Sequence, residues 1–119
     1  MASPILVLTT GGTFDKEYDP LKGSLTFPTY TSVRDILHLS GIHLGHWLVQ
    51  VLKKDSLELT FDDRELILLH CLMPTKRRIL IIHGTDTMTQ TADFLKKYVP
   101  GKTIVLIGAM VPYSFKESD

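Results

Sequence analysis

Short apolar runs recur along this chain, and each one ends in a polar or glycine-containing segment. Runs of this length with such endings are typical of strands buried in a sheet. The segments between them carry helix signals, so strands and helices alternate. This alternation predicts an α/β fold, a three-layer domain with a mostly parallel sheet. The runs cover residues 5–8, 47–52, 79–82 and 103–107.

Three helices are predicted between the runs, because each interval carries capping residues and a terminating glycine or proline. Thr31 can cap the first helix, which ends at Gly41, and Thr60 or Asp62 can begin the second. The polar segment after the first strand predicts a loop, followed by a small strand that can form a hairpin. The predicted ranges are 31–39, 60–73 and 89–98 for the helices, 15–22 for the loop and 23–27 for the small strand.

The length and charge balance of the chain exclude several classes of protein. Its 119 residues fit one domain over residues 1–119. The 13 Lys and Arg residues balance 13 Asp and Glu residues, so no basic surface for nucleic acid or a membrane is expected. No stretch has the roughly 18 apolar residues of a membrane span, and no signal peptide is evident. With a lone Cys71, these features predict a cytoplasmic protein.

The polar and glycine residues that follow the strands are expected to lie together. The carboxyl ends of parallel strands share one edge of a sheet, and ligands of open α/β sheets bind outside that edge. Segments distant in sequence should therefore form one site. They are residues 9–13, Asp55 with Ser56, residues 84–87 and the segment from Gly108.

The residue types at this edge suit nucleophilic chemistry. Thr13 and Thr85 are candidate nucleophiles, but a threonine hydroxyl needs a neighbour that takes its proton. Tyr18 lies close in sequence and can relay that proton, and Asp86 can bind a cationic group. Gly12 gives its loop the freedom to point N–H groups at an anion or an oxyanion.

Simpler interpretations of these residues remain open. One alternative is that the two glycines after the first strand simply form a turn. Another is a phosphate-binding nest, although the glycine spacing matches neither common nucleotide motif. Gly84, Thr85 and Asp86 can be a turn with helix caps, and Ser56 a cap or turn residue. The histidines lack convincing ligand spacing, so no metal site is expected. His83, which precedes Gly84, can support the site from behind.

The second predicted helix is apolar nearly all round between residues 65 and 73. Core burial on several sides is one explanation, and contact with another subunit is the alternative.

Together these residues resemble the L-asparaginase family of threonine amidohydrolases, in its compact bacterial branch. The order and rough spacing of the segments match that family over almost the whole chain. Asp55 and Ser56 fit the family's substrate-contacting serine loop. The matching motifs are Thr10-Gly11-Gly12-Thr13-Phe14, His83-Gly84-Thr85-Asp86-Thr87-Met88 and Gly108-Ala109-Met110.

The resemblance implies hydrolysis of L-asparagine to L-aspartate and ammonia, without a cofactor, in a homo-oligomer. Thr13 matches the primary nucleophile, and Tyr18 the tyrosine of a lid loop that helps to activate it. Thr85 and Asp86 match the second threonine and the acidic residue that binds the substrate's amino group. Ser56 matches a residue that holds the substrate's carboxylate. Backbone N–H groups of Gly12 and Thr85 are candidate oxyanion donors.

The family's catalytic lysine is expected on a stretch beyond the Gly-Ala-Met segment, after Asp119, and Lys116 does not match it. The chain is therefore expected to be C-terminally truncated. A non-catalytic module that binds an acidic amino acid is an alternative function. An asparaginase-like subunit of a tRNA-dependent amidotransferase is another, although no basic surface is expected.

Overall fold

The main sheet contains four parallel strands in the spatial order β4–β1–β5–β6. The computed structural model describes residues 5–39 and 46–115, so the helix end predicted at Gly41 lies outside the described residues, as does Lys116. The α/β class with a mostly parallel sheet is confirmed. The strands are β1 (Ile5–Gly11), β4 (His46–Lys54), β5 (Arg78–Ile82) and β6 (Thr103–Ile107).

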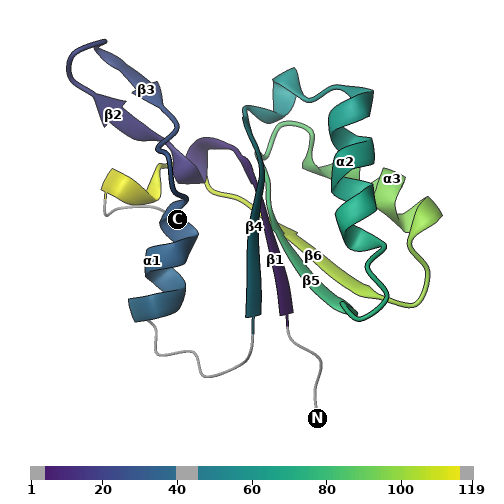
Figure 1. The fold of residues 1–119 in the computed structure, drawn as a ribbon. Helices are drawn as coiled ribbons and strands as arrows, with labels where there is room; N and C mark the ends of the chain where they lie inside the picture. The colour runs from purple at the N-terminus through teal and green to yellow at the C-terminus, as the bar shows by residue number, and fades with distance from the viewer. Residues whose placement is uncertain (1–4, 40–45, 116–119) are drawn as a thin grey trace.

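Helices cover the sheet on both faces (Figure 1). The helix α1 (Ser32–Leu39) lies on one face, and α2 (Phe61–Cys71) and α3 (Met88–Tyr98) lie on the other. Both ends of all three helices fall within two residues of their predicted ranges. No helix in residues 5–39 and 46–115 is long and apolar enough to cross a membrane.

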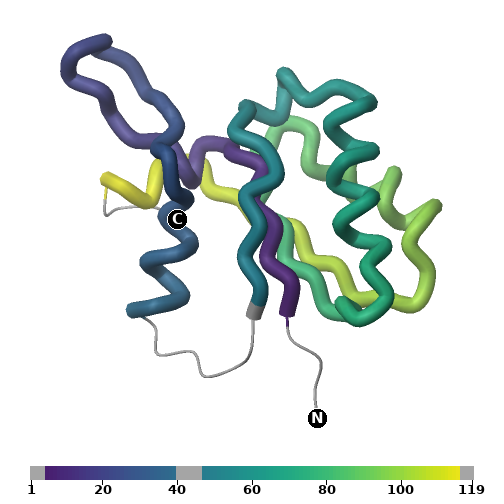
Figure 2. The backbone as a smooth tube through the Cα atoms, in the orientation of Figure 1, coloured from purple at the N-terminus to yellow at the C-terminus, as the bar shows by residue number. Residues whose placement is uncertain are grey.

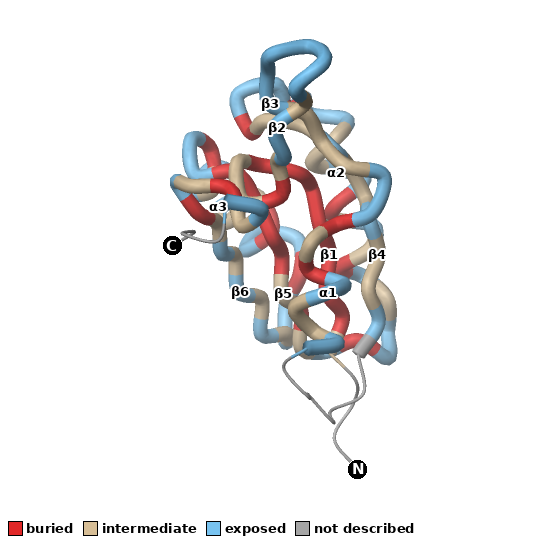
Figure 3. The backbone as a smooth tube through the Cα atoms, turned by 90° about the vertical axis from the view of Figure 1, so that its left-hand side faces the viewer, coloured by how far each residue is buried: buried red, intermediate tan, exposed pale blue. Residues whose placement is uncertain are grey.

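The core lies around the two central strands, β1 and β5, which are mostly buried in Figure 3. Leu6, Leu8 and Ile81 are fully buried against α2 and α3. Val7 and Ile82 face the opposite way and pack with Val33 of α1. A parallel strand with both faces covered reads as a continuous apolar run, which is why these strands were predictable. The central pair gives the site a rigid base.

A small hairpin corrects the prediction of a loop over residues 15–22. Strand β2 (Glu17–Asp19) pairs antiparallel with β3 (Ser24–Thr26). The Asp19 carboxylate accepts hydrogen bonds from the Leu21 and Lys22 N–H groups at 2.9 and 3.3 Å, and these bonds fix the turn. The sequence did not predict β2 because its residues are mostly polar and Pro20 follows them, and because this hairpin pairs outside the hydrophobic core.

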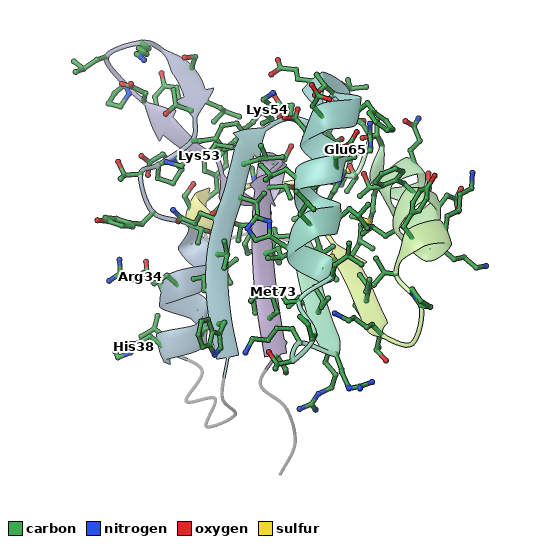
Figure 4. The ribbon with its side chains drawn as sticks, turned by 45° about the vertical axis from the view of Figure 1, so that its right-hand side comes forward. Arg34, His38, Lys53, Lys54, Glu65 and Met73 are labelled. Carbon is green, nitrogen blue, oxygen red and sulfur yellow. The ribbon has the colours of Figure 1, made fainter. Side chains whose placement is uncertain are left out.

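The start of α2 is fixed by a capping box at Thr60. The Thr60 hydroxyl accepts the Asp63 N–H at 3.1 Å, and the Asp63 carboxylate accepts the Thr60 N–H at 2.9 Å. Lys54, at the end of β4 beside this turn in Figure 4, donates to the same carboxylate at 2.8 Å and lowers the pKa of Asp63. Of the two predicted starts, Thr60 is therefore correct.

We expect Thr60→Ala to lower the free energy of unfolding by about 1 kcal/mol, because the Asp63 N–H in the first turn of α2 loses its hydrogen-bond acceptor. Urea denaturation measures the change. Thr89→Ala is the matched control, since Thr89 is exposed inside α3 and alanine suits a helix there. Equal stabilities of the two variants would contradict the capping role.

Of the two explanations offered for the apolar second helix, burial in the core on several sides does not fit α2 as observed. Only Ile67 and Cys71 of this helix are buried, and burial raises the pKa of the Cys71 thiol to about 11. Phe61 and Leu69 are 63% and 64% exposed. The apolar pattern therefore covers more of the helix than the core needs.

Candidate active site

The loops after β1, β4 and β5 meet at the carboxyl edge of the sheet, as Figure 2 shows along the chain path. A Cβ atom added to Gly12 would lie 2.7 Å from the Gly84 nitrogen, so these loops touch backbone to backbone. A Cβ atom added to Gly84 would lie 2.8 Å from the Ser56 Oγ. The predicted convergence of Gly12, Ser56 and Gly84 is therefore observed.

Gly12 has a conformation that only glycine adopts readily, with φ 77° and ψ 170°. Its N–H donates to the Lys54 carbonyl oxygen at 3.0 Å. That N–H is thus occupied within the protein, and the expectation that it serves as a free oxyanion donor is wrong for this conformation. The close packing, rather than N–H donation, explains the need for glycine here.

Two buried polar side chains fix the strand end that carries Thr13. The Thr10 hydroxyl donates to the Ile82 carbonyl oxygen at 2.8 Å, where the β1–β4 register shifts. The short helix η1 (Thr13–Asp15) follows, and the buried Asp15 carboxylate accepts the Ser32 N–H at 2.7 Å. These bonds tie both sides of Thr13 to the body of the domain. Thr13 itself is half-buried.

Thr85 and Asp86 are exposed at the same edge. The Thr85 hydroxyl donates to the Met110 Sδ at 3.5 Å, which joins this loop to the segment after β6. The Thr85 N–H has no hydrogen-bond partner among the described residues. It lies just before α3, whose N-terminal end carries a partial positive charge. Of the two expected donors, only the Thr85 N–H lacks a partner within the part of the chain that the structure describes.

Ser56 and Asp55 are both held by other protein groups. Ser56 begins the short helix η2 (Ser56–Glu58) and is buried, and its Oγ accepts the Thr87 N–H at 3.1 Å. Its own hydroxyl proton remains able to donate. Asp55 forms an ion pair with Lys16 at 2.6 Å. Lys16 follows η1, so this pair links the Thr13 loop to the Ser56 loop.

Tyr18 is not brought into this group. It lies on β2 of the hairpin, which extends beyond the carboxyl edge of the sheet in Figure 1, and it is 55% exposed. The short helix η3 (Tyr113–Phe115) approaches the base of this region, with the Tyr113 ring 5.7 Å from that of Phe14. The position of Tyr18 therefore has to be explained by movement of the hairpin or by a different role.

A polar network behind the loops contains residues that the sequence analysis missed. His83 was expected there, and its side chain is buried between Gly84 and Thr91. Arg64 of α2 and Thr87 at the start of α3 complete the network. Thr87 and Thr91 share the buried side of α3 with Leu95, and this spacing of threonines in an apolar stripe was the available signal.

A cavity of about 300 Å³ lies beside the strand ends, on the face of the sheet that α1 covers. Across residues 5–39 and 46–115, no three His, Cys, Asp or Glu side chains gather closely enough to hold a metal ion. The polar loops that follow the strands lie next to this cavity, whose lining is apolar. The cavity is lined by Phe14, Ile82, Ile107, Gly108 and Ala109.

The sequence matches a family model described as the N-terminal part of asparaginase, over residues 4–119. The chain therefore belongs to the asparaginase family. A glutaminase-asparaginase from Acinetobacter glutaminasificans is 29% identical over 128 residues, which cover 97% of this chain and 38% of that protein.

Solved structures give the same result. The thermostable L-asparaginase from Thermococcus kodakarensis matches with a TM-score of 0.80 and 30% identity, over 98% of this chain and 37% of that one. A probable cytoplasmic L-asparaginase from Campylobacter jejuni matches with a TM-score of 0.76 and 26% identity, over 99% of this chain and 38% of that one. The chain thus spans less than two fifths of the length of these relatives.

Proposed function

We propose that this chain carries the nucleophile of an amidohydrolase that converts L-asparagine and water to L-aspartate and ammonia. The observation that carries the proposal is the close approach of the Gly12 backbone to Gly84, and of Gly84 to Ser56. This contact gathers the Thr13 loop and the Thr85–Asp86 turn at one edge of the sheet. Membership of the asparaginase family supports the same chemistry.

Thr13 is proposed as the attacking group. Its Oγ forms a bond to the amide carbon, and its proton passes to a basic group. The oxyanion that forms is stabilised by a donor aimed at it, for which the Thr85 N–H, without a partner in residues 5–39 and 46–115, is suited. The C–N bond then breaks and ammonia leaves with a proton. Water cleaves the resulting ester, which releases L-aspartate and restores the Thr13 hydroxyl.

The substrate's charged groups need partners of opposite charge at the same edge. We assign Asp86 to the α-ammonium group, because its carboxylate is exposed beside Thr85. The α-carboxylate is assigned to the Ser56 hydroxyl, which still has a proton to donate, with the positive end of α3 behind it. Gly84 allows these two loops to approach closely enough for one amino acid to bridge them.

Tyr18 is proposed to act as the proton relay to Thr13 after the hairpin closes over the edge. The strands β2 and β3 are short, and the exposed residues Leu21 and Leu25 lie on this hairpin. Few buried contacts hold it, which favours a segment that moves at low energetic cost. Closure would also remove water from the reacting amide.

We further propose a cytoplasmic homo-oligomer. A relative from Campylobacter jejuni is described as cytoplasmic, and the exposed apolar side of α2 offers a surface for a second subunit. Light scattering of the purified chain measures its mass directly.

The deciding experiment is ammonia release from L-asparagine by this chain, with L-glutamine as the second amide because one relative is a glutaminase-asparaginase. Binding of L-aspartate is measured alongside by ¹⁵N NMR. Ammonia release supports the hydrolase. Binding without release replaces it with the amino-acid-binding module. If the chain shows no binding and no release, both functions are contradicted.

A further inference from the structure

The imidazole of His83 links the site to two helices. His83 is 1% exposed, its Nδ1 lies 2.7 Å from the Gly84 carbonyl oxygen, and its Nε2 lies 2.8 Å from the Thr91 Oγ1. On the far side of Thr91, the Nε of Arg64 donates to the same Oγ1 at 2.9 Å. A continuous chain of hydrogen bonds therefore runs from α2 through α3 to the loop after β5.

Chemistry fixes the direction of every bond in this chain. A carbonyl oxygen can only accept, so the His83 Nδ1 must carry a proton. Arg64 can only donate, so it uses one lone pair of the Thr91 Oγ1, and the Thr91 proton has no acceptor other than Nε2 among the described residues. The Nε2 atom is then unprotonated and accepts. The arrangement is fully satisfied only when His83 is neutral with its proton on Nδ1.

Charge and burial act in the same direction. Burial, more strongly than the nearby charge of Arg64, lowers the pKa of His83, against the opposing effect of the Gly84 carbonyl. Arg64 on α2 is the charged group whose field lowers the pKa of this imidazole, and α3 contributes the uncharged Thr91. A proton on Nε2 would leave the Thr91 hydroxyl proton without an acceptor among the described residues.

The consequence for the site follows from the geometry of one peptide bond. The Gly84 carbonyl and the Thr85 N–H belong to the same planar trans peptide and point in opposite directions. A bond that holds the carbonyl toward His83 therefore aims the Thr85 N–H away from it. This N–H is the one without a partner among the described residues.

Arg64 also holds the second loop of the site. Its Nη2 donates to the Thr87 Oγ1 at 2.9 Å, and the Thr87 hydroxyl donates to the Ser56 carbonyl oxygen at 2.9 Å. One guanidinium group thus positions the Gly84–Thr85 peptide and the Ser56 loop together.

We propose that Arg64 and Thr91 are positioning residues that lock His83 as the neutral Nδ1–H tautomer, and that this tautomer aims the Thr85 N–H at the bound amide. The tautomer lock stands independently of catalysis. The second part rests on the proposed function, because it needs a ligand at the edge of the sheet.

The test is ¹⁵N NMR of the histidine ring in the whole chain, because protonated and bare ring nitrogens have well-separated shifts. In the unmodified chain we expect His83 with its proton on Nδ1, persisting below the pH at which exposed histidines titrate. In Arg64→Met the nearby positive charge is lost, so we expect the pKa of His83 to rise and the doubly protonated ring to appear at a higher pH, while Nδ1 keeps its proton toward the Gly84 carbonyl. Arg64→Lys keeps a cationic donor and should restore part of the lock.

The matched control is Arg34→Met, since Arg34 is an exposed arginine on the outer side of α1 (Figure 4). It should leave the His83 spectrum unchanged. A proton on Nε2 in the unmodified chain overturns the lock even if Arg64→Met fails to fold. An Arg64→Met spectrum identical to that of the control overturns the role of Arg64.

The ligand step has its own measurement. We expect Arg64→Met to bind L-aspartate about tenfold more weakly, the effect of losing roughly one well-aimed hydrogen bond. The Thr85 amide signal should shift on binding in the unmodified chain and not in the variant. Binding without any Thr85 shift overturns the aiming role. An absence of binding in the unmodified chain counts against the proposed function, while the ring spectrum still decides the lock.

Discussion

Replacing Gly12 by alanine is expected to destabilise the fold by roughly 3 kcal/mol or more, through two separate costs. The backbone at Gly12 has φ 77° and ψ 170°, a region that alanine enters only with strain. The new Cβ would also lie 2.7 Å from the Gly84 nitrogen, closer than non-bonded atoms approach. The second cost is large because backbone atoms of two loops are packed together, and backbone cannot move aside as a side chain can.

Gly23→Ala is the matched control for this prediction. Gly23 also has a positive φ, of 65°, but a Cβ atom there would meet nothing within 4 Å. It should therefore lose about 1 kcal/mol, the conformational cost alone. Urea denaturation of both variants measures the difference. If Gly12→Ala is as stable as Gly23→Ala, the close contact between the Gly12 and Gly84 loops is not a tight constraint.

The contact between the Gly12 and Gly84 loops shows how much of the site could be predicted from the sequence. The apolar runs predicted the strands because central parallel strands are buried on both faces. Once the strands are parallel, the glycine and threonine segments after them must share an edge. Gly12, Ser56 and Gly84 were therefore predictable as neighbours without any knowledge of their side-chain contacts.

The network behind the site was not predictable in the same way. Arg64 lies on a helix, where an arginine is ordinarily a solvent-exposed residue. Its bonds to Thr87 and Thr91 depend on how α2 and α3 pack against each other, which neither helix encodes alone. The occupied N–H of Gly12 was missed for a related reason, since its partner is a carbonyl of another strand.

The outer side of α2 shows what an apolar pattern leaves open. The apolar residues of this helix allowed either core burial or contact with another subunit, and Leu69 is 64% exposed, which contradicts core burial at that position. Hydrophobicity reports that a residue prefers to leave water and does not say whether its own chain or another one covers it.

Thr13→Ala is expected to reduce ammonia release from L-asparagine by at least about a thousandfold, because no other group replaces the bond-forming Oγ. L-Aspartate binding should change by less than about threefold, since the charged ends of the ligand are held by other residues. Thr13→Ser keeps an attacking hydroxyl and should retain measurable release. Thr29→Ala, at an exposed threonine on the nearby loop, is the control for loss of a hydroxyl alone.

A covalent probe makes the same test independent of turnover. An asparagine analogue with an electrophilic carbon in place of the amide should modify Thr13, and peptide mass spectrometry should locate the adduct there. Thr13→Ala should then remain unmodified while Thr29→Ala reacts like the unaltered chain. Modification at Thr85 with Thr13 untouched would assign the nucleophile to the loop after β5. The roles of the two threonines would then be exchanged, because Thr13 would be left to position the water or the leaving ammonia.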